Sequence, residues 1–256
     1  MKFKYIYGPV ASWRLGSSLG IDLLSQKEKI CNFDCCYCQI GRNLKYLTQR
    51  KLYVPTQEII EEIKRLPDCQ IDYITFSGRG ESTLAINLSE TITAIKKLRK
   101  EPIAVLTNST LINKVDVRQE LTLADFVILK LDAFSQETLE LINNPAIGIK
   151  FDEIYNGIRA FREEYRGKLA LQIMFIDENK NSARRLFQLA REIQPDQVQI
   201  NTPLRQCKVK PLSPEEIFLI KRYFKGLNII CVYDAEDRDV TPISQSQTLK
   251  RRGTVM

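Results

Sequence analysis

The sequence predicts an α/β fold built around a parallel β-sheet. Six apolar segments of strand length alternate with amphipathic segments of helix length, and this alternation implies right-handed crossovers between parallel strands. The strand segments are almost continuously apolar, as is typical of strands buried on both faces. The chain has 256 residues, enough for one large domain of this class. A doubly wound sheet and a barrel both satisfy these observations.

The elements are expected wherever an apolar run or a helical stripe is bounded by turn residues. The predicted strands span residues 19–24, 73–77, 103–108, 126–131, 169–176 and 198–201. Helices are predicted over 56–66, 89–100, 116–123, 135–142, 152–165, 181–193 and 214–225. A glycine-containing approach, 8–20, precedes the first strand, a β-like run covers 228–233, and a polar tail ends in Lys250-Arg251-Arg252.

Two helices have clear terminal signals. For helix 56–66, Thr56 is the expected cap, and Pro67 follows its last residue. Its apolar stripe consists of Ile59, Ile60, Ile63 and Leu66. For helix 214–225, Ser213 and Glu216 form a predicted capping box, with Pro214 at the first helical position.

Four of the seven cysteines lie within eight residues, directly after the first predicted strand. Cys31, Cys35 and Cys38 have the spacing C-x-x-x-C-x-x-C. Three thiolates this close can bind an iron–sulfur cluster, and because a cubane takes one thiolate per iron, one iron stays open to a small molecule. The alternatives are a zinc site or ordinary buried cysteines. Zinc favours paired C-x-x-C motifs or histidines, and the chain has no histidine.

The remaining cysteines are expected to be bystanders. Cys36 lies inside the motif but outside its spacing, and Cys69, Cys207 and Cys231 are widely separated. Free cysteines commonly behave as small buried apolar residues.

Composition excludes several classes of function. Without histidine there is no histidine base, so hydrolase triads and most zinc enzymes are excluded. The net charge of +7 permits an anionic partner such as tRNA. The most basic short segment comprises Arg42, Lys45, Arg50 and Lys51, and a solvated loop is the alternative interpretation.

The sequence also predicts where the protein resides. No apolar run approaches the roughly 20 residues of a membrane span, and the N-terminus lacks a signal-peptide pattern. Clustered free cysteines fit a reducing compartment. We therefore expect a cytoplasmic protein without membrane association.

Polar residues gather at the carboxyl ends of the predicted strands, where both barrels and doubly wound sheets bind ligands. Gly78-Arg79-Gly80-Glu81 follows the second strand, and Asn108 and Ser109 follow the third. Both segments could also be simple turns. Lys130 and Asp132 are two apart at the end of the fourth strand, so they face the same side, and a mutual salt bridge is the alternative to a ligand-binding role.

The cysteine motif, with Tyr37 just before its last cysteine, resembles that of the radical S-adenosylmethionine (radical SAM) enzymes. In that superfamily the three cysteines hold a [4Fe–4S] cluster, and S-adenosylmethionine chelates the fourth iron. The resemblance implies a partial (β/α)6 TIM-type barrel with a short C-terminal extension. It also implies an enzyme that reductively cleaves S-adenosylmethionine to a 5′-deoxyadenosyl radical, which abstracts hydrogen from an unidentified substrate. The electron would come from a reductase such as flavodoxin or ferredoxin.

The resemblance assigns roles to the strand-end residues. The 78–81 segment is similar to the family's GGE segment, whose carbonyl and carboxylate groups accept hydrogen bonds from the methionyl ammonium; Ser82 stands where proline is frequent. The implied cofactor contacts are Tyr37 for adenine, Gly78, Gly80 and Glu81 for the ammonium, Asn108 and Ser109 for the ribose or methionyl part, Lys130 for the carboxylate and Asp132 for the ribose. Gln172 and Asn201 are candidates for the adenine pocket.

A weaker similarity points to a stand-alone subgroup often grouped with the wybutosine (tRNA imidazoguanosine) synthases. It rests on segments 8–20, 31–35, 76–84, 131–133 and 199–205. The wybutosine enzymes carry a second cluster on cysteines upstream of the motif. This chain has no cysteine before Cys31, which argues against that activity.

The predicted organisation is a core barrel over residues 1–205, with a lead-in over 1–18, followed by a C-terminal helix, β-like segment and basic tail over 206–256. Two other functions stay open. One is an RNA-modifying enzyme that holds phosphates with the basic segment and the basic tail. The other is a non-catalytic metal-binding protein. The substrate itself, whether RNA, protein or small molecule, is not indicated by the sequence.

Overall fold

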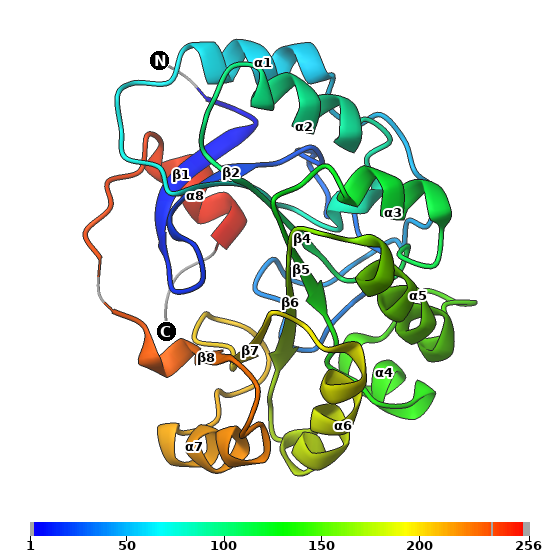
Figure 1. Ribbon diagram of the computed structural model, residues 1–256. Coiled ribbons are helices and arrows are strands. Elements are labelled where there is room, and N and C mark those ends of the chain that lie inside the picture. The colour runs from blue at the N-terminus through cyan, green and yellow to red at the C-terminus, as the bar shows by residue number, and fades with distance from the viewer. Residues whose placement is uncertain (1–2, 237, 253–256) are drawn as a thin grey trace.

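A single curled sheet of eight strands forms the centre of the molecule, and β1 and β8 are its two free edges (Figure 1). The computed structural model describes residues 3–236 and 238–252. The strands are β1 (Ile6–Ser12), β2 (Gly16–Ile21), β3 (Tyr73–Phe76), β4 (Ile103–Thr107), β5 (Phe126–Lys130), β6 (Lys168–Met174), β7 (Gln197–Asn201) and β8 (Ile229–Cys231). All neighbours are parallel except β1 and β2, which form an antiparallel pair.

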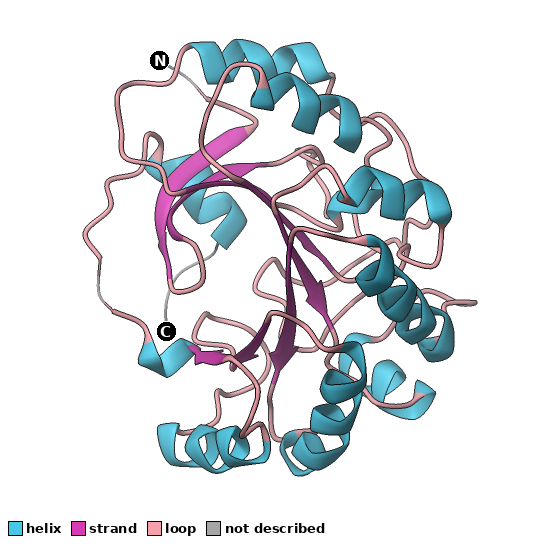
Figure 2. Cartoon of the chain, viewed as in Figure 1, coloured by secondary structure: helices cyan, strands magenta, loops and turns pink. Residues whose placement is uncertain are grey.

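Helices α1 to α7 lie along the convex outer side of the sheet, whereas α8 lies beside β1 at the open side (Figures 1 and 2). Their bounds are α1 (Thr56–Lys64), α2 (Leu88–Lys96), α3 (Val115–Leu121), α4 (Gln136–Asn143), α5 (Phe151–Glu164), α6 (Ala183–Ile193), α7 (Pro214–Tyr223) and α8 (Gln245–Arg252). The short 3-10 helices are η1 (Ser82–Leu84), η2 (Lys180–Ser182) and η3 (Val232–Asp234). No described helix is long and apolar enough to cross a membrane.

The predicted fold class is confirmed: the six predicted strands are β2 to β7, and together they form the partial barrel. β1 is an additional strand that the sequence pattern did not indicate. It contains Gly8 and Pro9, which weaken the strand signal, and its register shifts between Tyr7 and Val10. The β-like run 228–233 contributes β8, which extends the sheet beside β7.

Two predictions about helices had different outcomes. The capping box of α7 is confirmed, because Ser213 Oγ accepts from the Glu216 amide at 3.2 Å and Glu216 accepts from the Ser213 amide at 2.9 Å. The cap assigned to Thr56 was wrong. Pro55 occupies the N-cap of α1, and the Thr56 hydroxyl instead bonds to that of Thr91 in α2, 3.0 Å away.

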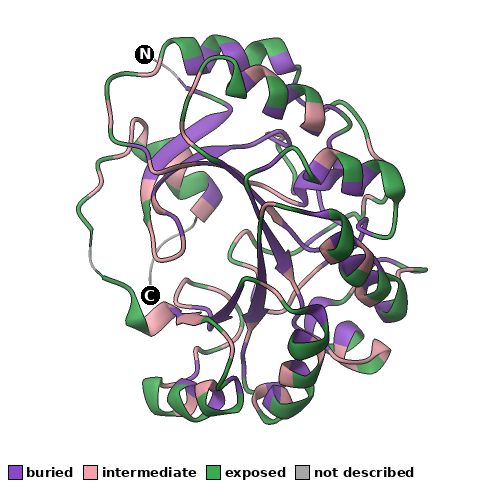
Figure 3. Ribbon diagram, in the orientation of Figure 1, coloured by how far each residue is buried: buried purple, intermediate pink, exposed green. Residues whose placement is uncertain are grey.

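Inward-facing side chains divide the barrel interior into two layers. At the amino ends of the strands, an apolar cluster closes the interior: Leu15, Ala104, Phe126, Ile128 and Ala170. The alternate residues Val127 and Leu129 point outward into the larger core beneath the helices. Figure 3 shows the strands buried and the outer helix faces exposed. Further along the same inward face lie Lys130 and Gln172, which are paired in register and line a pocket. The carboxyl ends of the strands therefore carry the polar, hollow part of the barrel.

Candidate active site

The cysteine loop, residues 22–55, connects β2 to α1 and is fixed to the barrel from two sides. On one side Ile30 pairs with Gly80: the Ile30 amide donates to the Arg79 carbonyl, and the Glu81 amide donates to the Ile30 carbonyl, both at 2.9 Å. On the other side, Phe33 pairs with Pro145 just after α4. A Cβ on Gly80 would lie only 1.6 Å from the Ile30 carbonyl oxygen, so glycine is required for this close approach.

Cys31, Cys35 and Cys38 line one pocket of about 310 Å³ at the carboxyl ends of the strands. An N–H donor from a different part of the fold reaches each sulfur. Lys29 Nζ lies 3.2 Å from Cys38 Sγ, Asn143 Nδ2 lies 3.4 Å from Cys35 Sγ, and Asn108 Nδ2 lies 3.8 Å from Cys31 Sγ. All four cysteines of the motif are free thiols.

The donor set suits an iron–sulfur cluster. Thiolates bind one iron each and are tuned by hydrogen bonds to sulfur, and the three N–H contacts supply such bonds. Within residues 3–236 and 238–252, no three cysteine or acidic side chains converge closely enough to hold a single metal ion. Ligands of a cluster need not converge on one point, because each binds its own iron.

Burial keeps the Cys31 and Cys35 thiols protonated in the metal-free protein. It raises the pKa of Cys31 to about 12 and that of Cys35 to about 11. Metal binding would therefore release protons from this site.

Cys36 does not line the pocket. It packs against the small apolar cluster formed by Tyr37, Ile142 and Ile176. Burial raises its pKa to about 12.

Tyr37 lines the pocket beside Lys130, the last residue of β5. Its hydroxyl bonds to the Asp132 carboxylate and accepts from Asn143 Nδ2 at 2.9 Å. Lys130 Nζ lies 4.9 Å from the centre of its ring and 3.4 Å from Asp132. The expected alternative, a Lys130–Asp132 salt bridge, is thus present, and Lys130 also lines the pocket.

The Asp132 carboxylate is buried behind Tyr37 and is not among the pocket-lining groups. Besides the tyrosine hydroxyl, it accepts from Asn143 Nδ2 at 2.9 Å and from the Met174 amide at 2.8 Å. Through these contacts, Asp132 holds the Tyr37 side chain in place at the pocket wall.

Glu81 is buried and tied to the end of β4. One carboxylate oxygen accepts from the Thr83 amide at 3.0 Å and the Thr107 hydroxyl at 2.6 Å, and the other accepts from the Asn108 amide at 2.5 Å. Burial raises its pKa, while these hydrogen bonds oppose the rise. Gly78, Gly80 and Glu81 all line the pocket.

The remaining predicted contacts are divided between the pocket and the wall behind it. Asn108, Gln172 and Asn201 line the pocket. Ser109 is fully buried with a positive φ of 69°, and its hydroxyl donates to the Lys130 carbonyl at 3.1 Å. Ser109 therefore positions β4 against β5 and lies outside the pocket lining.

Several pocket residues were not predicted from the sequence, namely Tyr7, Arg14, Lys29, Arg251 and Arg252. Arg251 and Arg252 belong to the predicted basic tail, which instead forms α8. Lys29 could have been predicted from the sequence, because it lies only two residues before the first cysteine of the motif.

Two of the basic residues predicted to hold RNA phosphates are engaged with acidic side chains. Arg50 is bonded to Asp116 at 3.1 Å and to Glu120. Arg251 is fully buried in an ion pair with Asp22 at 2.7 Å.

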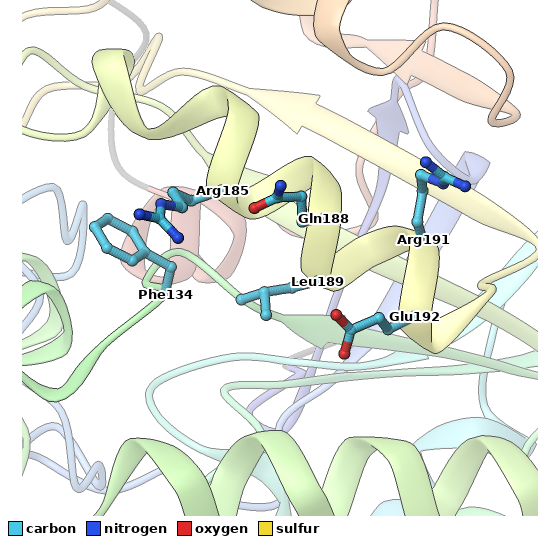
Figure 4. Close-up of a pocket in the computed structure, with 6 residues that line it drawn as sticks. All are labelled: Phe134, Arg185, Gln188, Leu189, Arg191 and Glu192. Atoms are coloured by element: carbon cyan, nitrogen blue, oxygen red, sulfur yellow. The ribbon is translucent and has the colours of Figure 1, made fainter.

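Another hollow, of about 550 Å³, lies on the outer helical layer (Figure 4). It is lined by Phe134 and by five residues of α6: Arg185, Gln188, Leu189, Arg191 and Glu192. No cysteine lines it, and it is separate from the strand ends that carry the three cysteines. We therefore assign the chemistry to the cysteine-lined pocket.

A partial α/β barrel with three cysteines on the loop after its first parallel strand is the architecture of an S-adenosylmethionine-dependent iron–sulfur enzyme. Residues 29–190 match the family model described as the radical SAM superfamily. The chain therefore belongs to the radical SAM superfamily and is a radical SAM enzyme, a family that uses S-adenosylmethionine and an iron–sulfur cluster.

Its relatives include UPF0026 proteins. One from Synechocystis is 41% identical over 214 residues, covering 83% of this chain and 79% of the relative. One from Methanocaldococcus jannaschii is 36% identical over 231 residues, covering 88% and 71%. These matches do not test the resemblance to the wybutosine group, which stays a prediction.

Among solved structures, Streptococcus suis SuiB bound to S-adenosylmethionine superposes with a TM-score of 0.63 at 16% identity. The match covers 80% of this chain and 48% of SuiB, so the chain spans about half the length of that protein. At this identity the likeness concerns the fold.

Proposed function

We propose that this chain holds a [4Fe–4S] cluster on Cys31, Cys35 and Cys38 and uses it to activate S-adenosylmethionine for hydrogen abstraction from a substrate. The observation that carries the proposal is the shared pocket: three thiols, each contacted by an N–H donor, lie beside strand-end groups suited to one polar ligand. When bound, the reduced cluster would supply the electron that cleaves the cofactor to methionine and a 5′-deoxyadenosyl radical.

The chain's own residues would bind and orient the cofactor. Lys130, one of the cations that line the pocket, would face the methionyl carboxylate, and the carbonyl groups around Gly78 and Gly80 would be acceptors for the ammonium. Tyr37, whose ring is fixed by Asp132 and Asn143, would pack against the adenine. Asn108 is the strand-end amide nearest the cysteines and would contact the ribose or methionyl part.

Asp132 and Ser109 would act from behind the wall. Asp132 holds Tyr37 and Lys130 in place, and Ser109 joins the ends of β4 and β5. Asp132 and Ser109 would therefore act as positioning residues, and the side chains that line the pocket would contact the cofactor directly.

Anaerobic reconstitution with iron and sulfide tests the cluster. The wild-type protein should bind about four irons per chain and cleave S-adenosylmethionine after reduction. Cys35→Ala should lose both the visible absorption of the cluster and the cleavage. Cys69→Ala is the matched control, because Cys69 is a half-buried cysteine outside the pocket, and it should retain both. Unaltered cofactor cleavage by Cys35→Ala would falsify the proposal.

The electron must come from a partner protein. A reductase such as flavodoxin or ferredoxin would dock near the cysteine loop, whose residues Leu44 and Tyr46 are exposed. Reduction of the reconstituted protein by purified flavodoxin, measured as bleaching of the cluster absorption, tests this assignment. Reduction by dithionite alone, with no transfer from flavodoxin or ferredoxin, would contradict it.

A further inference from the structure

A second cavity adjoins the cysteine-lined pocket. It has a volume of about 510 Å³, within the range of sites that hold small organic molecules. The two cavities share Tyr37, Met174 and Asn201 as lining residues. A molecule bound in the second cavity would therefore extend directly toward the cofactor pocket.

The second cavity is markedly cationic. Four of its lining residues are arginines, Arg14, Arg205, Arg238 and Arg252, and Glu236 is the one carboxylate among the described lining residues. Arg238 pairs with Asp72 at 3.1 Å. Arg14 and Arg252 form no ion pair with any carboxylate in the part of the chain that the structure describes.

The unpaired state of Arg14 and Arg252 contrasts with the other sequestered arginines. Arg251 bonds to Asp22 at 2.7 Å, Arg118 bonds to Glu164 at 3.0 Å, and Arg50 bonds to Glu120. A guanidinium removed from water is costly unless an anion faces it. Arg79 also has no carboxylate partner among the described residues, but its guanidinium donates to the Lys27 and Lys250 carbonyls and it lines neither cavity. Arg14 and Arg252 line both cavities, so an anion bound there would face them.

Arg14 is the clearest case of a guanidinium group without a partner for each of its donors. Its Nε is buried without a hydrogen-bond partner among the described residues. Burial, with Arg252 and Arg205 nearby, lowers its pKa to about 10. Its guanidinium lies 5.0 Å from the centre of the Trp13 ring, which holds it at the end of β1.

Arg252 is placed by the residue before it. Arg251 anchors the end of α8 through Asp22, the Lys4 carbonyl at 2.7 Å and the Ser25 hydroxyl at 2.7 Å. Arg252 then donates to the Ala11 carbonyl at 3.4 Å. Arg14 is thus placed by its contact with Trp13, and Arg252 is placed by the anchored end of α8 and by Ala11.

We propose that Arg14 and Arg252 bind a phosphate group of the substrate, so that the enzyme acts on a small phosphorylated molecule. Two guanidinium groups balance the charge of about −2 that a phosphate monoester carries at neutral pH, and their planar forks match its oxygens. The phosphate would occupy the second cavity, and the part to be oxidised would lie at the shared wall. This inference rests on the proposed function for its reaction, but phosphate binding is independent of it.

The test measures binding of inorganic phosphate to the reconstituted protein, by calorimetry or by ³¹P line broadening. We expect saturable binding to the wild type. Arg252→Gln and Arg14→Gln should each weaken it about tenfold or more, since each removes a charge-assisted hydrogen bond. Arg238→Gln is the matched control from the same cavity, and because Arg238 is exposed and paired it should bind like the wild type. If Arg14→Gln does not fold, Arg14→Lys replaces it and should weaken binding less.

The other outcomes overturn the inference. Equal binding by wild type and Arg252→Gln would place the anion elsewhere. Acetate binding as tightly as phosphate would exclude the phosphate specificity. An equal loss of S-adenosylmethionine affinity in Arg252→Gln would assign the arginines to the cofactor carboxylate. Tight binding of a single-stranded RNA oligonucleotide that displaces phosphate would make the partner an RNA. Failure of cofactor cleavage with intact phosphate binding would count only against the proposed function.

Discussion

Inward-facing side chains change character along each central strand. On β5, Phe126 and Ile128 near the amino end are fully buried and apolar, whereas Lys130 at the carboxyl end faces a pocket. On β6 the same change runs from Ala170 to Gln172. The amino-terminal layer is apolar and contributes packing energy. In the carboxyl-terminal layer, polar groups surround a cavity at the expense of packing. We therefore expect substitutions in the apolar layer to lower mainly stability, and substitutions in the polar layer to lower mainly ligand binding.

The largest effect on stability is expected in the apolar layer. Phe126→Ala removes a fully buried ring that packs against Tyr73 and should lower the free energy of unfolding by about 3–5 kcal/mol. Denaturant unfolding measures the change. Phe218→Ala is the control, because that ring is exposed, and it should alter stability by about 0.5 kcal/mol at most. S-Adenosylmethionine affinity of folded Phe126→Ala should equal that of the wild type, and a loss comparable to that of pocket variants would remove the distinction between the layers.

The next effect is on binding. Lys130→Gln removes the cation proposed to face the cofactor carboxylate and should weaken S-adenosylmethionine binding about tenfold, as expected for one charge-assisted hydrogen bond. Its cost in stability should be smaller than that of Phe126→Ala, because Tyr37, Asn143 and the Met174 amide still bond to Asp132.

Lys168→Gln is the matched control for this binding measurement. Lys168 stands at the opposite end of the neighbouring strand, exposed and over the Phe126 ring at 4.5 Å. Equilibrium dialysis on the reconstituted variants compares the two lysines. Equal S-adenosylmethionine affinities of Lys130→Gln and Lys168→Gln would show that the position of the lysine in the barrel does not affect cofactor binding.

The same division explains what could be predicted from the sequence. Strands β3 to β6 have apolar runs, and the cysteines have a short fixed spacing, so both are visible in local patterns. β1 was missed because Gly8 and Pro9 interrupt its pattern. The pairing of Arg251 with Asp22 spans 229 positions, and a run of basic residues indicates a solvated tail until its partner is known.

Residues that line the pocket were harder to predict than residues at strand ends. Asp132 and Ser109 stand where a ligand contact is expected, but their side chains are already bonded to Tyr37 and to the Lys130 carbonyl. Which way a strand-end side chain turns depends on neighbours from other segments. Local sequence spacing therefore identifies the rim of the site, and the tertiary contacts determine which rim residues face the ligand.

Among the substitutions inside the barrel, the smallest expected effect on stability is that of Gln172→Leu. Gln172 lies in register between Lys130 on β5 and Gln199 on β7, and its side chain is 6% exposed at the pocket wall. Replacing a nearly buried amide by an apolar side chain of similar size should change the free energy of unfolding by less than about 1 kcal/mol, and an increase is consistent with the trade of stability for binding. Cofactor affinity should fall, because the polar wall loses a donor and an acceptor. Paired denaturant and binding measurements on this one variant check both expectations. A loss of stability near that of Phe126→Ala would mean that Gln172 belongs to the packed layer, and the boundary between packing and binding would then lie closer to the mouth of the barrel.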